Sequence, residues 1–253
     1  MFTVKRAIIM AAGFGTRLRP ITNHTPKPLI AVNGVRMIDT VLMGLIKNEI
    51  TEIYVVVGYL KEQFAQLPEA YKDTKSAGGK KVKITLIENP YYKECNNISS
   101  LYVAKDYLSE CVIIDGDQVL NNCNILEPDA ERSGYCSSWS EAHTDEWLQK
   151  TDDTGIVISC SRTGGEEGWE LHGVSFWSQE DCVKLKKHLE IEFEDKKNRQ
   201  IYWDDLAMFC YKEQYHLGIR KISDDDIIEI DSIDELREID SSYKEIKNVK
   251  YQR

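Results

Sequence analysis

The chain has 253 residues, with 42 acidic side chains (Asp and Glu) against 32 basic ones (Lys and Arg), so its formal net charge is −10. That length suits one α/β domain or two small ones, because single hydrophobic cores stop growing at roughly 250–300 residues. The hydrophobic share of 42% argues against intrinsic disorder. The excess of negative charge argues against a nucleic-acid-binding protein held by a basic face.

The cysteines and the N-terminal segment favour a cytoplasmic protein. The seven cysteines form no metal-type C-x-x-C pair, so reduced thiols are the simplest interpretation. Two basic residues before an apolar run at residues 7–12 superficially resemble a secretion signal, but that run is too short. No stretch approaches the roughly 20 apolar residues that cross a bilayer, so no membrane insertion is expected. The sequence gives no basis for an oligomeric state.

The predicted elements of the first half alternate between strand and helix. Strands are expected at residues 4–11, 53–57, 82–87 and 111–114, and helices in the segments 38–46, 61–67 and 98–108. The second of these helices is expected to end near Pro68. This order favours a largely parallel sheet that is covered by helices.

The pattern changes after about residue 130. Short segments at residues 135–140, 156–160 and 173–177 alternate with polar turns, which favours antiparallel strands. A helix at 179–195, strands at 217–222 and 227–230, and a last helix opened by a capping box of Ser232 and Glu235 follow. The predicted fold class is α/β, with a Rossmann-like, mostly parallel central sheet flanked by helices and a smaller mixed or antiparallel lobe. With no long linker, residues 1–253 are expected to form a single domain with lobes at about 1–130 and 131–253.

The first 36 residues carry six basic side chains and no acidic one, although the chain as a whole is anionic. Within this block, residues 13–17 leave the first predicted strand at its carboxyl end, where open α/β sheets bind ligands. Glycines in such a loop let backbone N–H groups approach a phosphate closely. A lone G-x-G is also compatible with an ordinary turn, because the third glycine of a dinucleotide fingerprint and the Gly-Lys-Ser/Thr of a P-loop are both missing.

A longer string is more specific. A-A-G-F-G-T-R-L-R-P-I-T at residues 11–22, followed by T-P-K-P-L at residues 25–29, resembles the signature loop of the nucleotidyltransferases that join nucleoside triphosphates to sugar phosphates and related phosphorylated alcohols. The resemblance implies a nucleotide-binding lobe in the first half and metal-assisted attack on the α-phosphate. It implies that Arg17 acts on the leaving pyrophosphate and Lys27 on the phosphates near the reacting centre. The nucleotide-binding residues that it implies are Ala11, Ala12, Gly13, Gly15, Thr16, Gly58, Asn96 and Ser99.

Two aspartates are the metal-ligand candidates. Asp117 follows the fourth predicted strand, and Asp231 lies between a strand and the capped helix. Mg²⁺ prefers oxygen ligands and commonly binds one or two carboxylates together with substrate phosphates. The family resemblance assigns Mg²⁺ to these two aspartates, although each alone could be a turn or cap residue. Asp115 is expected to shape the turn or to support the site.

Aromatic side chains lie beside carboxylates in the second half, in E-W at 146–147, G-V-S-F-W at 173–177 and Y-W-D-D at 202–205. Aromatic faces with nearby acids suit a quaternary ammonium group. A sugar site would more often require convergent hydrogen-bonding groups. A primary amine would require more carboxylate and less aromatic lining.

Several segments resemble the bacterial CTP:phosphocholine cytidylyltransferases: 58–64, 96–101, 144–147, 173–177, 202–204 and 229–232. The resemblance is weakest at 67–83, 121–134 and 152–171, and Gln118 stands where Asn is expected. It implies that the choline headgroup lies among five residues of an acceptor-binding lobe: Trp147, Tyr202, Trp203, Asp204 and Glu229. Trp177 and Trp203 could instead belong to the core.

The hypothesis is therefore a cytidylyltransferase that binds CTP and phosphocholine and forms CDP-choline and pyrophosphate by in-line attack on the α-phosphate. The same chemistry with phosphoethanolamine, 2-aminoethylphosphonate or a sugar 1-phosphate as acceptor remains an alternative. A catalytically silent nucleotide-binding subunit is a further alternative, but Arg17, Lys27 and both metal-ligand candidates are present.

Overall fold

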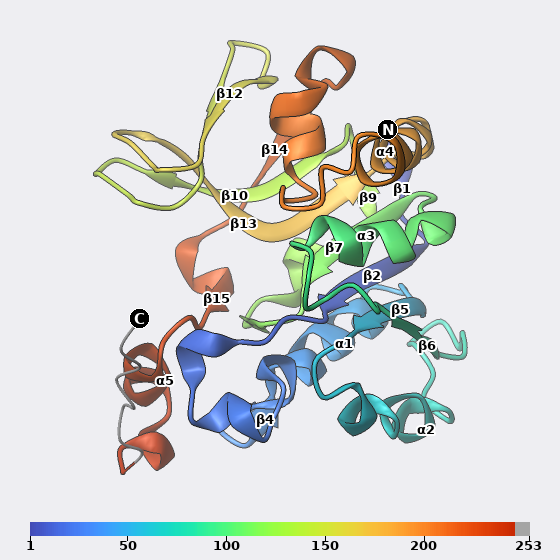
Figure 1. Ribbon diagram of the computed structural model, residues 1–253, viewed down its shortest axis with the longest axis vertical. Coiled ribbons are helices and arrows are strands. Elements are labelled where there is room, and N and C mark those ends of the chain that lie inside the picture. The colour runs from blue at the N-terminus through green and yellow to red at the C-terminus, as the bar shows by residue number, and fades with distance from the viewer. Residues whose placement is uncertain (246–253) are drawn as a thin grey trace.

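A nine-stranded sheet organises the molecule, in a computed structural model that describes residues 1–245 (Figure 1). Its parallel part consists, in spatial order, of β6 (Lys83–Glu88), β5 (Glu52–Val57), β2 (Arg6–Ala11) and β7 (Cys111–Asp115). Three of these strands, β5, β2 and β7, contain continuous buried apolar runs because both faces of the sheet are covered there, whereas the edge strand β6 includes Thr85 and is mostly half-buried. The four strands predicted for the first half are confirmed.

The sheet continues into the second half of the chain through β13 (Gly168–Trp177), which is antiparallel to β7. The remaining strands of this sheet are β10 (Gly134–Ser140), β11 (Leu148–Thr151), β12 (Val157–Ser161) and β14 (Gly218–Lys221). The expected antiparallel pairing is confirmed for β10, β11, β12 and β13, whereas β14 is parallel to β10. The predicted α/β class with a mostly parallel central sheet is therefore confirmed.

Three two-stranded sheets surround this core. They pair β1 (Phe2–Thr3) with β9 (Asp129–Ala130), β3 (Ala31–Val32) with β4 (Val35–Arg36), and β8 (Gln118–Leu120) with β15 (Ile227–Glu229). The pair of β8 and β15 matters most for function, because it joins the segment after β7 to a segment near the C-terminus.

Five α-helices lie in the described residues: α1 (Met37–Lys47), α2 (Leu67–Tyr71), α3 (Ile98–Val103), α4 (Gln179–Glu190) and α5 (Ile233–Ile239). Short 3₁₀ turns cover Thr16–Leu18, Ile21–Asn23, Lys27–Leu29, Lys61–Phe64, Lys105–Tyr107, Cys123–Leu126, Lys212–Gln214, Asp224–Asp226 and Ser241–Tyr243, and π turns cover Ile191–Asp195 and Leu206–Cys210. None of the helices described is long and apolar enough to cross a membrane.

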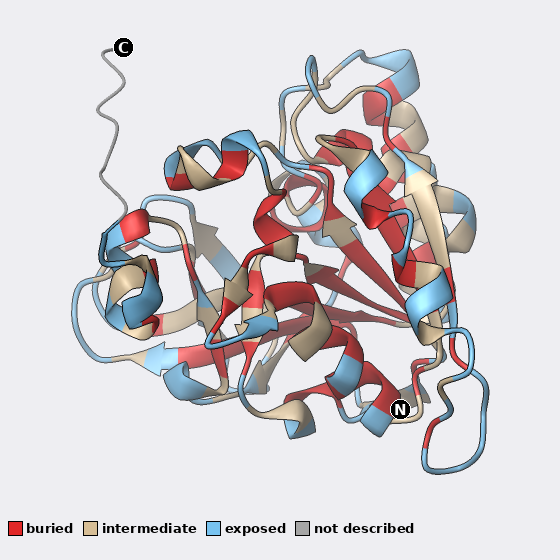
Figure 2. Ribbon diagram, turned by 90° about the horizontal axis from the view of Figure 1, so that it is seen from below, coloured by how far each residue is buried: buried red, intermediate tan, exposed pale blue. Residues whose placement is uncertain are grey.

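Alternate residues of β2 pack against opposite layers. Ile9 belongs to the cluster that contains Leu42 of α1, and Ile8 belongs to the cluster that contains Leu185 of α4. This follows from the two-residue period of a strand. Figure 2 shows the central strands and the helix faces that meet them as the buried part of the molecule.

The helix expected at 61–67 is wrong in its bounds. Residues 61–64 form a 3₁₀ turn, and α2 begins at Leu67 with Pro68 in its first turn. Proline is tolerated there because a first-turn N–H has no partner within the helix. Pro68 therefore lies at the beginning of a helix and not at its end. The helix expected over 98–108 is also shorter, because α3 ends at Val103.

A third hydrophobic cluster joins the two ends of the chain. Leu18 and Ile30 from the N-terminal segment pack with Ile230 and with Leu236 of α5. Figure 1 shows α5 beside this N-terminal segment. The cluster explains how residues near 231 come to lie beside residues 17–27. The division into lobes at about residue 130 stays a prediction.

Candidate active site

The glycine loop after β2 has a backbone that favours glycine at position 15. Gly15 has φ +60°, and a Cβ atom placed there would lie 3.0 Å from Lys27 Cβ and 3.0 Å from Thr22 Cγ2. The Thr22 hydroxyl donates a hydrogen bond to the Gly15 carbonyl oxygen at 2.8 Å. The loop is therefore fixed against the segment that carries Lys27.

This loop forms one wall of a cavity of about 360 Å³, which we call the glycine-loop cavity. The predicted site residues that line it are Ala11, Ala12, Gly13, Gly15, Thr16, Arg17, Lys27, Asp117, Tyr202 and Glu229. Met10 of β2 lies opposite Asp115 of β7 in the parallel register. The carboxyl ends of both strands therefore open into the same cavity.

Three predicted nucleotide-binding residues do not line this cavity: Gly58, Asn96 and Ser99. A Cβ atom at Gly58 would lie 3.0 Å from the Ala12 carbonyl oxygen, so this glycine serves close packing behind the loop. Ser99 is buried, and its hydroxyl donates to the Asn96 carbonyl oxygen at 2.8 Å.

The neighbours Asn97 and Ser100 line the cavity in place of Asn96 and Ser99. Residues three apart lie on the same face at a helix start, so 97 and 100 face one side while 96 and 99 face another. Of the predicted segment 96–100, the structure therefore brings Asn97 and Ser100 to the cavity and not Asn96 and Ser99.

Three carboxylates, which we call the acid cluster, lie close together, and two of them line this cavity. One oxygen atom from each of Asp117, Glu229 and Asp231 lies within 4.8 Å of the other two. Antiparallel pairing of β15 with β8 places Glu229 opposite Gln118, next to Asp117. We predicted Glu229 as an acceptor residue only, although its two-residue spacing from Asp231 could have indicated that both share one face of a strand.

Lys27 bridges two of these carboxylates. Its Nζ atom lies 2.8 Å from Asp117 Oδ2 and 2.8 Å from Asp231 Oδ1, and the residue is 5% exposed. Burial by itself would lower the pKa of Lys27, but the charges and hydrogen bonds of the two aspartates outweigh it, so this pKa lies above its ordinary value. Arg17 Nη2 lies 2.7 Å from Asp231 Oδ1 as well.

The acid cluster has the donor chemistry that Mg²⁺ requires. Carboxylate oxygens are its preferred protein ligands, and the Lys27 ammonium already shows that Asp117 and Asp231 converge on a cation. Part of the Glu229 side chain is exposed, but surrounding protein atoms still desolvate its carboxyl group. This desolvation and the like charge of Asp117 and Asp231 raise the pKa of Glu229 to about 8. A divalent ion would relieve this repulsion. The ion itself stays a prediction.

A second cavity of about 360 Å³ adjoins the first and shares five lining residues with it: Arg17, Asn97, Asp115, Tyr202 and Glu229. All five predicted acceptor residues line this second cavity, which we call the acceptor pocket: Trp147, Tyr202, Trp203, Asp204 and Glu229. The rings of Trp147 and Tyr202 meet edge to face, with centroids 5.5 Å apart. The structure therefore brings together residues from distant parts of the second half.

The core alternative holds for one tryptophan and in part for another. Trp177 is fully buried and donates from Nε1 to the Ser175 hydroxyl at 2.9 Å. Trp203 is 3% exposed and packs on Trp177, with ring centroids 5.8 Å apart, yet it also lines the acceptor pocket. Trp203 is thus both a core residue and a pocket wall.

Asp204 lies in a desolvated position in this pocket. Burial raises its pKa to about 7, although the Tyr135 hydroxyl donates to its Oδ1 at 2.9 Å and partly offsets the effect. An acidic side chain of this kind is easily protonated near neutral pH.

Sequence analysis missed Arg162, which also lines the acceptor pocket. Its Nη2 and Nε atoms donate to Asp205 Oδ1 at 2.5 and 2.9 Å. Its guanidinium carbon lies 4.2 Å from the centre of the Phe209 ring and 5.7 Å from that of Trp147. No motif surrounds Arg162, so no sequence signal could have found it.

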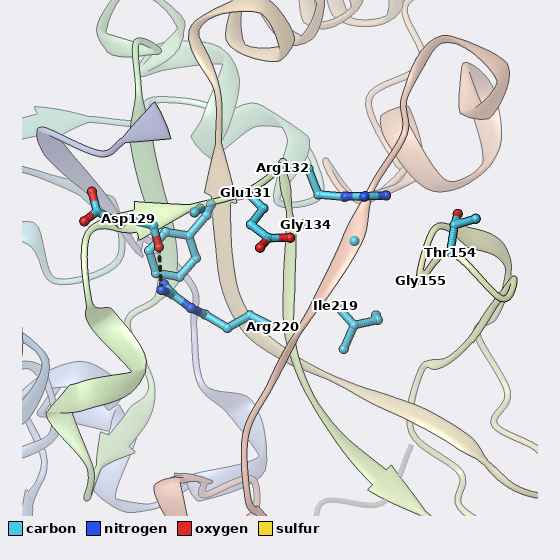
Figure 3. A pocket seen from close by; sticks show the side chains of 11 residues that line it. Asp129, Glu131, Arg132, Gly134, Thr154, Gly155, Ile219 and Arg220 are labelled. Atoms are coloured by element: carbon cyan, nitrogen blue, oxygen red, sulfur yellow. Dashed lines mark hydrogen bonds between the residues drawn. The ribbon is translucent and has the colours of Figure 1, made fainter. Parts of the chain in front are cut away.

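Another cavity, of about 370 Å³, lies away from the predicted site residues (Figure 3). Arg132 and Arg220 are among its lining residues. Arg220 donates to the carbonyl oxygens of Glu127 and Asp129 at 2.7 Å each and lies 4.1 Å from the Phe176 ring centre. Its guanidinium is therefore engaged in holding the surrounding chain.

Comparison with known proteins agrees with this geometry. Residues 6–127 match the family model for nucleotidyl transferases. A 2-aminoethylphosphonate cytidylyltransferase of Lancefieldella rimae is 38% identical, over 94% of this chain and 92% of the relative. The choline-phosphate cytidylyltransferase of Streptococcus pneumoniae is 34% identical over 94% and 98%.

Solved structures give the same result. The structure of CTP:phosphocholine cytidylyltransferase from Streptococcus pneumoniae superposes with a TM-score of 0.83 at 33% identity and covers 95% of this chain and 99% of its own. An inositol-1-phosphate CTP transferase from T. maritima shares the fold, with a TM-score of 0.72 at 17% identity, covering 98% and 99%. The fold holds a glycine loop, an acid cluster and an adjoining pocket, and the relatives match along nearly their whole length. The chain therefore belongs to the nucleotidyltransferase family and, within it, to the cytidylyltransferases.

Proposed function

We propose that the chain transfers CMP from CTP to a small acceptor that carries a phosphate or phosphonate at one end and a cationic nitrogen at the other, with phosphocholine as the first candidate. The observation that carries this proposal is the position of the acid cluster. Asp117, Glu229 and Asp231 lie where the glycine-loop cavity and the acceptor pocket meet. A triphosphate in one cavity and an acceptor in the other would meet at these carboxylates.

On the nucleotide side, the phosphates of CTP bind along residues 13–17, and the nucleoside lies near Ala12, Asn97 and Ser100. The backbone N–H groups of the glycine loop and the charge of Arg17 favour the leaving pyrophosphate. Lys27 neutralises charge near the α-phosphate. These contacts position the triphosphate and stabilise the charge that develops as it reacts.

The acceptor needs no activating base. Its phosphate or phosphonate oxygen is already an anionic nucleophile; this oxygen forms a bond to the α-phosphorus while the bond from that phosphorus to the leaving pyrophosphate breaks. Asp117, Glu229 and Asp231 would hold Mg²⁺, which when bound supplies charge neutralisation at the α-phosphate and its leaving group. Arg17 and Lys27 supply fixed positive charge from the protein beside it.

On the acceptor side, the cationic nitrogen lies among aromatic rings and acids. Trp147, Tyr202 and Trp203 provide ring surface, and Asp204 provides opposite charge. A quaternary ammonium favours such rings because it has no N–H group to donate. This lining supports phosphocholine.

A second acceptor, 2-aminoethylphosphonate, is favoured by specific observations. The relative from Lancefieldella rimae carries that name and is 38% identical to this chain. Asp145 and Glu146 also line the acceptor pocket and could accept hydrogen bonds from a primary ammonium, together with Asp204.

Pyrophosphate release tests the proposal. Purified protein is assayed with CTP and, in turn, phosphocholine, phosphoethanolamine, 2-aminoethylphosphonate and glucose 1-phosphate, with Mg²⁺ and with a chelator. We expect release with CTP and an amine-bearing acceptor, and none in chelator. Asp117→Asn is the control variant and should lose turnover with every acceptor while keeping its thermal unfolding midpoint within a few degrees. Release that requires UTP and the sugar phosphate would overturn the proposal.

A further inference from the structure

Arg162 places a cation at the wall of the acceptor pocket, beside Trp147, one of the three rings proposed to receive the substrate cation. It follows β12 directly and lies in the connection to β13. Its guanidinium carbon is 4.2 Å from the Phe209 ring centre and 5.7 Å from that of Trp147. Both distances lie within the roughly 6 Å range of a cation–π contact.

A buried carboxylate holds Arg162 in this position. Asp205 is 1% exposed, and its Oδ1 accepts from two nitrogen atoms of Arg162. The other oxygen, Oδ2, accepts the backbone N–H of Tyr202 at 2.9 Å. One carboxylate therefore fixes the guanidinium and the pocket segment at Tyr202 relative to each other, so Arg162 is a built part of the pocket.

This arrangement affects two kinds of acceptor differently. A trimethylammonium group has no N–H and depends on ring faces for its attraction, and Arg162 already lies over the ring of Trp147 in this pocket. A primary ammonium has three N–H groups and can bind carboxylates such as Asp204 and Glu146 without the rings. Repulsion from the guanidinium acts on both groups, but only the primary ammonium has an alternative set of partners.

We propose that Arg162 is a specificity-determining residue that disfavours quaternary ammonium acceptors relative to primary ammonium acceptors. The proposal rests on the proposed function, because it requires the acceptor's nitrogen to lie in the acceptor pocket. It concerns a ratio between two acceptors, so it holds whichever acceptor the wild-type protein uses best.

Phosphocholine and phosphoethanolamine form the matched pair of probes, because they differ only by three N-methyl groups. Arg162→Met keeps an unbranched apolar side chain and removes the charge. We expect the ratio of kcat/KM for phosphocholine to that for phosphoethanolamine to rise about tenfold. A change of this size matches the strength of a single cation–π contact that is between exposed and partly buried. The KM for CTP should not change. If one compound is not turned over, its inhibition constant against the other replaces its KM.

Two further variants separate specificity from folding. Arg162→Lys keeps the charge and should leave the ratio within about threefold of wild type. Arg162→Met combined with Asp205→Asn removes both halves of the ion pair, so no buried charge is left unpaired, and the Asn oxygen can still accept from Tyr202. The double variant should show the same rise in the ratio as the single variant.

Arg199→Met is the matched control. The Arg199 guanidinium carbon lies 4.6 Å from the Phe193 ring centre and 5.9 Å from that of Tyr91, yet Arg199 lines neither cavity of the site. This variant should leave the ratio unchanged.

The proposal is overturned if the ratio of kcat/KM for phosphocholine to that for phosphoethanolamine is unchanged or lower both in Arg162→Met and in the double variant with Asp205→Asn. An equal loss with both acceptors, together with a changed KM for CTP, also overturns it, because that pattern indicates a structural role. If wild-type protein releases no pyrophosphate from CTP with any acceptor of the panel, the proposed function itself fails, and that result is distinct from a turnover ratio that does not respond to Arg162.

Discussion

Lys27 and Arg17 pair with the two aspartates of the acid cluster. Three carboxylate groups this close repel one another, and the desolvation that raises the pKa of Glu229 makes the repulsion stronger. Lys27 contacts Asp117 and Asp231, and Arg17 contacts Asp231. Both cations also line the glycine-loop cavity, so their charge offsets the carboxylates and also faces the space proposed for the phosphates.

The contribution of Asp204 to the stability of the fold should depend on pH. Its pKa is about 7 in the folded protein against roughly 3.9 in an unfolded chain. The protonated form therefore adds stability that is fully present below about pH 4 and is lost as the pH rises through 7. Asp204→Asn cannot ionise, so its stability relative to wild type should rise by about 2–3 kcal/mol between pH 5 and pH 8.

Thermal unfolding midpoints at the two pH values measure this difference. Asp152→Asn is the control. The hydrogen bond from the Thr154 hydroxyl lowers the pKa of Asp152, so this carboxyl group is ionised above pH 5 in both the folded and the unfolded protein. Its midpoint should differ from wild type by the same amount at pH 5 and pH 8. If Asp204→Asn also shows no pH dependence, Asp204 is not desolvated in solution.

Residues that belong to a contiguous motif could be predicted from the sequence, and isolated ones could not. Arg17, Lys27 and Asp117 lie in or next to strings whose residue types and spacing restrict their role, and the structure brings them together. Arg162 lies outside any motif, and its position depends on Asp205 and on two rings from other segments. Its place in the pocket is a property of tertiary packing alone.

At the scale of elements, α5 positions one of the predicted metal ligands. The carboxylate of Glu235 accepts the backbone N–H groups of Asp231 at 2.6 Å and of Ser232 at 3.1 Å. The Ser232 hydroxyl accepts the Glu235 N–H at 3.2 Å and completes the capping box. The helix start therefore fixes the backbone from which Asp231 reaches Lys27.

Ser232→Ala should weaken both the helix and the predicted metal site. Loss of an N-cap costs about 1 kcal/mol, which corresponds to a midpoint roughly 2–4 °C lower. The concentration of Mg²⁺ that gives half-maximal turnover should rise severalfold, because Asp231 is held less firmly. Both values are measured on the same preparation.

Ser178→Ala supplies the comparison. Ser178 caps α4 in the same way, with its hydroxyl accepting the Asp181 N–H at 3.2 Å, and lines neither cavity of the site. It should lower the midpoint by a similar amount and leave the Mg²⁺ dependence unchanged. Equal Mg²⁺ dependence in the two variants would contradict a positioning role for α5.

Buried parallel strands were the elements that sequence predicted best, because a strand covered on both faces must be a continuous apolar run. Short helices were predicted less well. Pro68 stops a helix in the interior but not in the first turn, and the pattern around it does not distinguish the two positions. The periodicity over 98–108 continues past Val103, where the helix itself ends.

At the scale of the whole molecule, the site depends on contacts that no local pattern contains. Lys27 and Asp231 are 204 positions apart in the chain and meet through the hydrophobic cluster of Leu18, Ile230 and Leu236. The family resemblance predicted that the two residues meet, but residue spacing could not. Strand β13 contributes in the same way, since it pairs with β7 of the first half and with β10 of the second.

Gly173 is the point where β13 passes the site, and Gly173→Ala tests how tightly the two halves are joined there. A Cβ atom at this position would lie 2.4 Å from Asp115 Oδ2 and 2.5 Å from Gln118 Nε2. Both contacts are too short, so the side chains of Asp115 and Gln118, which flank Asp117, must move. We expect turnover to fall at least tenfold, with a loss of stability of about 1–3 kcal/mol.

Gly168→Ala on the same strand would crowd Leu148 at 2.9 Å, away from the acid cluster, and should cost similar stability with a smaller loss of turnover. Turnover and unfolding midpoint are measured for both variants at one temperature, well below either midpoint. If both lose the same fraction of turnover for the same loss of stability, the effect is general destabilisation, and the close approach of β13 to Asp115 has no specific role in holding the acid cluster.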